Sequence, residues 1–118
     1  MAPVTVYGLR NCDTVKKAVA WLDAHGIDYR FHDLKRQGLE PALLDDWIAR
    51  TGWEALINRR GLTWRKLDVE RRQNLDAGGA RQVMLENPAI IRRPILLTAD
   101  GELFVGFSEV DYETHFRR

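Results

Sequence analysis

The first third of the chain alternates between strand-like and helix-like patterns. Residues 4–8 read Val-Thr-Val-Tyr-Gly, and this alternation of β-branched and aromatic residues predicts a strand. From Asp13 onward, apolar side chains recur three or four residues apart until His25 and Gly26, which predicts an amphipathic helix that ends there. Residues 27–33 alternate again and predict a second strand. A crossover helix of this length normally joins parallel strands, so we expect a right-handed β-α-β unit.

The middle of the chain is helical in character but interrupted. Pro41 can begin a helix at its first turn, and Gly52 can end it. The stretch that follows, to residue 87, predicts short helices separated by glycines and by a proline: Gly61, Gly78-Gly79 and Asn87-Pro88.

The end of the chain predicts a hairpin and a last helix. Residues 95–98 and 103–105 are strand-like, and Asp100-Gly101 between them is typical of a two-residue hairpin turn. Ser108, with Asp111 three residues later, predicts the N-cap of a helix over residues 109–116.

The predicted order is therefore β-α-β, a helical insert at about residues 40–87, and β-β-α. A length of 118 residues suits one domain. The insert is short and broken, so we expect it to pack on the same core, giving a single domain over residues 1–118. Hydrophobic residues make up 45% and charged residues 30% of the chain, which is typical of a globular protein.

Charge and hydropathy exclude several classes of protein. Eighteen Lys and Arg against 17 Asp and Glu give a net charge of +1, so we expect no nucleic-acid partner. No segment approaches the roughly 20 apolar residues of a membrane helix, and the start lacks the apolar run of a signal peptide. We expect a cytoplasmic monomer. The three histidines lie far apart in the sequence, so we expect no metal site.

The one cysteine, Cys12, lies between Asn11 and Asp13 at the predicted start of the first helix. Unpaired backbone N–H groups and the positive end of the helix dipole meet there. Thiols in such places can have pKa values of roughly 3.5–7.5 instead of about 8.5, and the thiolate is the nucleophile. The alternative is a buried structural cysteine, but polar neighbours favour a reactive one. The Thr14 hydroxyl can donate to the sulfur or serve only as a first-turn residue.

Several short motifs, in order, carry a family resemblance. They are Asn11-Cys12-Asp13-Thr14, Lys17-Ala18, the stretch Ile57 to Leu67, Arg93-Pro94 and Ser108-Glu109. Over nearly its full length the chain resembles the arsenate reductase-like branch of the thioredoxin superfamily, in particular its YffB-like proteins. The resemblance implies an α/β, thioredoxin-like fold with a four-stranded mixed sheet. It also implies Cys12 as the nucleophile, and a cis Pro94 that faces the thiol.

The sequence departs from the arginine set that the resemblance implies. Arsenate reductases of this family hold the oxyanion with three arginines, of which Arg93 matches one. Asn58, with Arg59 beside it, stands at the second position and Gly106 at the third, while Val15 replaces a serine. A charge-assisted contact is worth roughly 1.5–3 kcal/mol, so we expect arsenate to bind weakly.

A lone cysteine dictates the predicted mechanism, because no second cysteine can resolve a mixed disulfide. An external thiol must do so. We expect a glutathione-dependent thiol-disulfide oxidoreductase, with glutathione as co-substrate, a second glutathione or a glutaredoxin as resolving partner, and no permanently bound cofactor. The predicted site comprises catalytic Cys12 and Arg93, with Asn11, Thr14, Arg59, Arg60 and Pro94 binding glutathione or substrate.

Two alternatives stay open at this point. One is a true arsenate reductase. The other is a regulatory module like the Spx transcription regulators, which share the fold and dock on RNA polymerase. Val15 stands where many of those proteins carry a second cysteine, so their dithiol switch cannot operate here.

Overall fold

The computed structural model describes residues 4–117, and their contacts divide the chain into two compact units. The sheet unit contains the described residues up to Asp33 and those from Arg93 onward. The helical unit contains residues 34–92. The sheet unit is thus built from both ends of the sequence, and the helical unit is inserted between its two parts.

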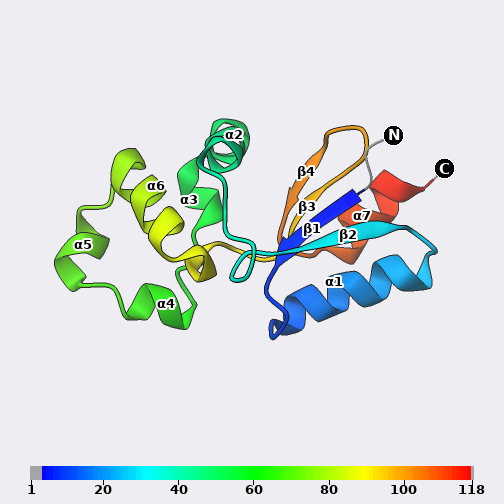
Figure 1. The fold of residues 1–118 in the computed structure, drawn as a ribbon, viewed down its shortest axis with the longest axis horizontal. Helices are drawn as coiled ribbons and strands as arrows, with labels where there is room; N and C mark the ends of the chain where they lie inside the picture. The colour runs from blue at the N-terminus through cyan, green and yellow to red at the C-terminus, as the bar shows by residue number, and fades with distance from the viewer. Residues whose placement is uncertain (1–3, 118) are drawn as a thin grey trace. The chain divides into compact units, whose positions relative to one another are not determined.

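One mixed sheet of four strands, in the order β2-β1-β3-β4, forms the centre of the sheet unit (Figure 1). The pairing of β1 with β2 is parallel, and the pairings of β1 with β3 and of β3 with β4 are antiparallel. This is the thioredoxin-like arrangement, so the predicted α/β fold and its four-stranded mixed sheet are confirmed. The strands are β1 (Val4–Gly8), β2 (Tyr29–Asp33), β3 (Ile95–Leu97) and β4 (Leu103–Val105).

Two helices, α1 (Asp13–Ala24) and α7 (Glu109–Phe116), cover one face of this sheet. Val4 and Val6 point to the same face of β1 because side chains two residues apart in a strand do so. There they join a fully or nearly fully buried cluster whose other members come from both helices and from β3: Ala18, Trp21, Leu22, Leu96 and Tyr112. The predicted final helix has the predicted bounds, and the Ser108 hydroxyl accepts a hydrogen bond from the Asp111 N–H at 3.2 Å as its cap.

The helical unit consists of short helices, as its glycine and proline breaks predict. Its buried side chains include Leu44, Trp47, Leu56 and Met84, and they lie on helices that contact one another. The helices are α2 (Pro41–Thr51), α3 (Trp53–Leu56), α4 (Leu62–Arg65), α5 (Val69–Gln73), α6 (Ala77–Glu86) and the 3-10 turn η1 (Pro88–Ile90). That this unit and the sheet unit form a single domain with a shared core stays a prediction.

Two turn predictions were wrong in detail. The Thr98 N–H donates to the Glu102 carbonyl at 2.9 Å, so the hairpin loop is Ala99-Asp100-Gly101 and not a two-residue turn. Gly101 has a φ of +90°, which suits the glycine position of a three-residue loop. The second strand also begins later than expected, because the Ile27 N–H donates to the Leu22 carbonyl at 3.0 Å and thereby closes α1.

Gly78 and Gly79 do not separate two helices but lie in the first turn of α6. The Asp76 carboxylate accepts a hydrogen bond from the Gly79 N–H at 2.8 Å. This cap satisfies one of the helix's unpaired donors and lets the helix begin before the two glycines.

Candidate active site

Cys12 lies at the N-cap of α1, in an extended conformation with φ −102° and ψ 122°. Its carbonyl accepts the Lys16 N–H at 3.0 Å, which begins the helix, and its own N–H donates to the Leu9 carbonyl at 3.3 Å. The half-buried side chain makes no capping hydrogen bond. The prediction that the cysteine lies at the start of the first helix is therefore confirmed.

Close packing beside the end of β1 fixes the start of this helix. Gly8 is buried, and a Cβ at this position would lie only 2.8 Å from Cγ2 of Val15. Real Cβ atoms do not approach so closely. The missing side chain therefore allows α1 to pack against β1, and the loop that carries Cys12 spans the short gap between them.

The strand register brings other predicted residues to the same edge of the sheet. Tyr7 pairs with Ile95, so the end of β1, which leads to Cys12, lies beside the start of β3. The Arg93–Pro94 peptide bond directly before β3 is cis, as the resemblance implies. The Gly106 N–H donates to the Pro94 carbonyl at 2.8 Å. Pro94 is buried and Arg93 half-buried.

An ion pair at this edge was missed in the sequence. Asp33 ends β2 opposite Gly8, and its carboxylate lies 3.6 Å from Nε of Arg10. The Asp33 side chain is 8% exposed, whereas that of Arg10 is 69% exposed. The guanidinium of Arg10 also lies over the Phe31 ring at 5.6 Å. A useful signal was available: polar residues at the carboxyl ends of neighbouring parallel strands gather at one edge.

The small polar residues predicted around Cys12 lie at the surface. Asn11 and Thr14 are exposed, the first in the turn before α1 and the second in its first turn. Asp13 supplies a carboxylate to the same turn, where it interacts favourably with the helix dipole. The contacts of Asn11 and Thr14 with a substrate stay predictions.

Two predicted arginines belong to the helical unit and are exposed there. The Arg59 guanidinium lies 5.5 Å from the centre of the Trp64 ring. The Arg60 N–H donates to the side-chain oxygen of Asn58 at 3.1 Å, and the Arg60 carbonyl accepts from the Arg65 guanidinium at 3.0 Å. These contacts shape the turn before α4. A role for Arg59 and Arg60 beside Cys12 stays a prediction.

Within residues 4–117 no three His, Cys, Asp or Glu side chains are grouped so that they could hold a metal ion. Over the same residues no helix has the length and apolar character needed to cross a membrane.

The sheet order, with a cysteine at the start of α1 and a cis-proline before β3, defines a thioredoxin-like protein with a single cysteine. The chain belongs to the ArsC family, whose model matches residues 7–115. The family resemblance seen in the sequence is thereby confirmed.

Solved structures and a curated relative agree with this assignment. A protein named YFFB is 41% identical, with a TM-score of 0.88, covering 94% of this chain and 96% of its own. An arsenate reductase (ArsC) related protein from Brucella melitensis is 49% identical, with a TM-score of 0.78, covering 99% and 97%. The global transcriptional regulator Spx of Streptococcus pyogenes is 28% identical over 117 residues, 98% of this chain and 86% of the relative. The chain is thus an ArsC-family protein that is also related to Spx.

Proposed function

We propose that the protein is a glutathione-dependent thiol-disulfide oxidoreductase in which Cys12 is the only nucleophile. The observation that carries this proposal is the position of Cys12 at the N-cap of α1. Helix N-termini stabilise anions through their unpaired N–H groups, and a thiolate is such an anion. Membership of the ArsC family supports the same class of chemistry.

Arg93 is the proposed cationic partner of the site. The register of β1 and β3 supports this role, because the end of one strand and the start of the other share an edge of the sheet. A guanidinium there would stabilise the thiolate and orient a carboxylate of glutathione. In this proposal Asn11, Thr14 and Pro94 line the remainder of the site, and glutathione binding by Arg59 and Arg60 stays a prediction.

The proposed cycle balances with glutathione as the only reductant. The Cys12 thiolate attacks the glutathione sulfur of a mixed disulfide, forms a Cys12–glutathione disulfide and releases the substrate thiolate, which takes up a proton. A second glutathione thiolate then attacks the glutathione sulfur of this adduct, releases the Cys12 thiolate and leaves as oxidised glutathione. A glutaredoxin can replace the second glutathione. Glutathione is thus a co-substrate and no cofactor stays bound.

Mass spectrometry after incubation with oxidised glutathione tests the proposal. We expect one glutathione adduct on Cys12, reversed by reduced glutathione, and none in Cys12→Ser. Glutathionylated peptide should be reduced by the wild type and not by this variant. Arg93→Ala should slow adduct formation, while Arg92→Ala, a change at the exposed neighbouring arginine, should not. Full activity of Cys12→Ser, or a thiol inert to oxidised glutathione, would exclude the scheme.

A regulatory role is the second candidate function. The likeness to Spx over 117 residues favours it, since that relative is named a global transcriptional regulator. We propose as this alternative a module that docks on RNA polymerase, without a dithiol switch because Val15 replaces the second cysteine. Co-purification of polymerase with both wild type and Cys12→Ser, together with an inert thiol, would favour the regulator over the enzyme.

Arsenate reduction is a further version of the enzyme. It requires a site that binds the arsenate oxyanion. Asn58 and Gly106 stand at two positions where the family pattern has arginines, so we expect the oxyanion to bind more weakly. Glutathione-dependent arsenate reduction by the wild type, lost in Cys12→Ser, would support this version. We expect the glutathionylated peptide to be the better substrate.

A further inference from the structure

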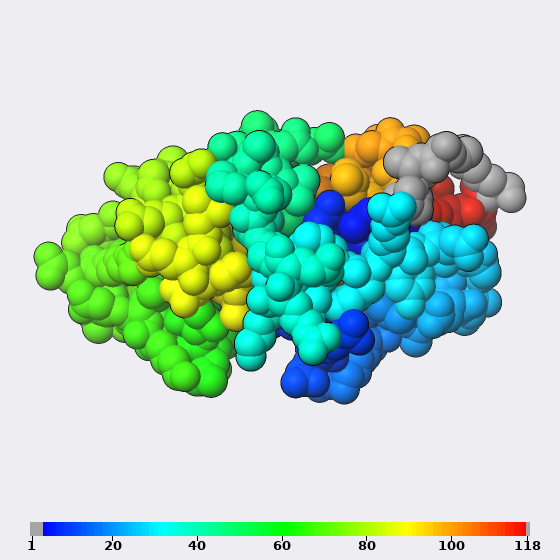
Figure 2. Space-filling model, viewed as in Figure 1, coloured from blue at the N-terminus to red at the C-terminus, as the bar shows by residue number. Residues whose placement is uncertain are grey.

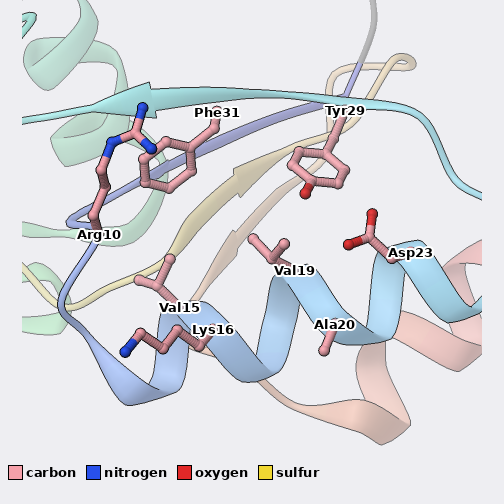
Figure 3. Close-up of a pocket in the computed structure, with 8 residues that line it drawn as sticks. All are labelled: Arg10, Val15, Lys16, Val19, Ala20, Asp23, Tyr29 and Phe31. Atoms are coloured by element: carbon pink, nitrogen blue, oxygen red, sulfur yellow. The ribbon is translucent and has the colours of Figure 1, made fainter.

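A pocket of about 410 Å³ lies between α1 and the edge strand β2, within the sheet unit. We call it the α1–β2 groove. Space-filling atoms of α1 and β2 lie side by side at the surface there (Figure 2). None of the functional residues predicted from the sequence lines it. Its lining comes from α1, from β2 and from Arg10 in the loop that precedes α1 (Figure 3).

The body of the groove is apolar and aromatic. Val15, Val19 and Ala20 form the side contributed by α1, while Tyr29 and Phe31 form the side contributed by β2. These two rings share a face because they are two residues apart in the strand. Ligand sites commonly combine such apolar walls with a small number of polar groups that fix orientation.

The two ends of the groove carry opposite charges. Lys16 and Arg10 lie at the end nearer the start of α1, and Asp23 lies at the other (Figure 3). Lys16 is exposed and forms no ion pair with any of the residues between Val4 and Arg117. The ion pair of Arg10 with Asp33 is long, at 3.6 Å, and mostly exposed on the arginine side. The Arg10 guanidinium carries five N–H donors, so Arg10 as well as Lys16 can bind a ligand anion.

Asp23 faces Tyr29 at the acidic end. Burial raises the pKa of Tyr29, and so do the negative charge of Asp23 and a side-chain hydrogen bond to it. Figure 3 shows the two groups pointing toward one another. A carboxylate has two oxygens and about four acceptor sites, so Asp23 can accept from an ammonium group as well.

The distance between the charges of Lys16 and Asp23 indicates how long a ligand can be if it contacts both. Lys16 and Asp23 are seven residues apart on α1, and at 1.5 Å per residue this is about 10 Å along the helix axis. Three extended residues span about the same distance, at roughly 3.3–3.6 Å each. A tripeptide with apolar side chains therefore matches the groove in length, in polarity and in the charges at its two ends.

We propose that the α1–β2 groove binds short apolar peptides with free termini, with the amino group at Asp23 and the carboxylate at Lys16 and Arg10. This binding needs no thiol chemistry and goes beyond the proposed function. The carboxylate end lies at the end of α1 that carries Cys12. The groove would therefore hold the peptide in a defined direction relative to the thiol.

An NMR titration of ¹⁵N-labelled Cys12→Ser protein with the tripeptide Ala-Phe-Ala tests the proposal. Using this variant separates peptide binding from any reaction of the thiol. We expect saturable shifts of the amides along residues 15–23 and 29–31. C-terminal amidation and N-terminal acetylation of the peptide should each weaken binding about two- to fivefold, the range for an exposed charge pair.

Matched variants locate the two contacts. In Lys16→Ala the difference between the amidated and free peptides should shrink, because only Arg10 is left to hold the carboxylate, whereas in Lys17→Ala, a change at an exposed neighbour outside the groove, the difference should persist in full. In Asp23→Asn acetylation should lose its effect. The proposal is overturned if either capped peptide binds as tightly as the free one to the unchanged groove. It is also overturned if Lys17→Ala acts like Lys16→Ala, or if millimolar peptide moves no groove amides.

Discussion

Replacement of Gly8 by alanine tests how the start of α1 is held against the sheet. In Gly8→Ala the new methyl carbon would lie 2.8 Å from Cγ2 and 3.2 Å from Cγ1 of Val15. Val15 is only 2% exposed, so its side chain has little room to turn away. Either the valine or the first turn of α1 must shift. We therefore expect the substitution to destabilise the protein.

The expected magnitude follows from the costs of packing changes. Adding a methyl group to a closely packed core costs typically 1–3 kcal/mol, a large part of a net stability of about 5–15 kcal/mol. Val15→Ala alone removes two buried methyl groups, which costs about 1.6 kcal/mol in burial, plus a cavity term. In the double variant the alanine at position 8 fills part of that cavity. The double variant should therefore be more stable than the sum of the single changes predicts, by about 1–2 kcal/mol.

Urea unfolding followed by tryptophan fluorescence measures all four members of this cycle. If the slope of the free energy of unfolding against urea concentration is the same in all four proteins, a shift of the midpoint measures a change in stability. Gly78→Ala is a matched control, since the nearest atom to its new Cβ is at 3.8 Å. This change lies in a helix and should stabilise the protein by up to about 1 kcal/mol. Additive effects of Gly8→Ala and Val15→Ala would refute the packing argument.

Two further predictions concern single side chains. Tyr112 is fully buried, its hydroxyl has no hydrogen-bond partner among the described residues, and burial raises its pKa far above the usual value of about 10. The folded state therefore keeps the hydroxyl proton at a pH where the unfolded state loses it. Above pH 10 the free energy of unfolding of the wild type should fall by about 1.4 kcal/mol per pH unit relative to that of Tyr112→Phe. An equal difference between the urea midpoints of the two proteins at pH 7 and at pH 11 would contradict this. Asp76→Ala should cost about 0.5–2 kcal/mol by removing the cap on α6, whereas Asp68→Ala, at an N-cap without a side-chain hydrogen bond, should cost little in the same urea assay.

Local sequence patterns predicted most of the elements, because their causes are local. Strand alternation set β1 at residues 4–8, and the Ser108 cap set the start of α7. Predictions that relied on glycine alone were less accurate. Gly78 and Gly79 fit inside a helix because Asp76 caps it, and glycine permits a break without requiring one. The loop at Asp100-Gly101 is longer than predicted because Thr98 and Glu102 continue the hairpin.

In the candidate site, too, the features with local causes were predicted and those that depend on tertiary structure were not. The position of Cys12 at a helix start follows from its neighbours in sequence, and the cis bond before Pro94 followed from the family resemblance. Polar residues at the carboxyl ends of parallel strands indicate this edge of the sheet. The ion pair of Arg10 with Asp33 itself depends on the register that brings the end of β2 beside that of β1, which neighbours in sequence do not specify. The α1–β2 groove likewise depends on how far two elements stand apart.

Residues 34–92 are inserted between the two parts of the sheet unit, so the strands of one sheet are synthesised at different times. β1 and β2 are synthesised early and can pair at once, but β3 arrives only after the whole insertion has been made. At about 5–20 residues per second, the free side of β1 therefore waits several seconds for its native neighbour. During synthesis this backbone edge is open to pairing with other chains, so the nascent protein should benefit most from a chaperone before its last strands emerge.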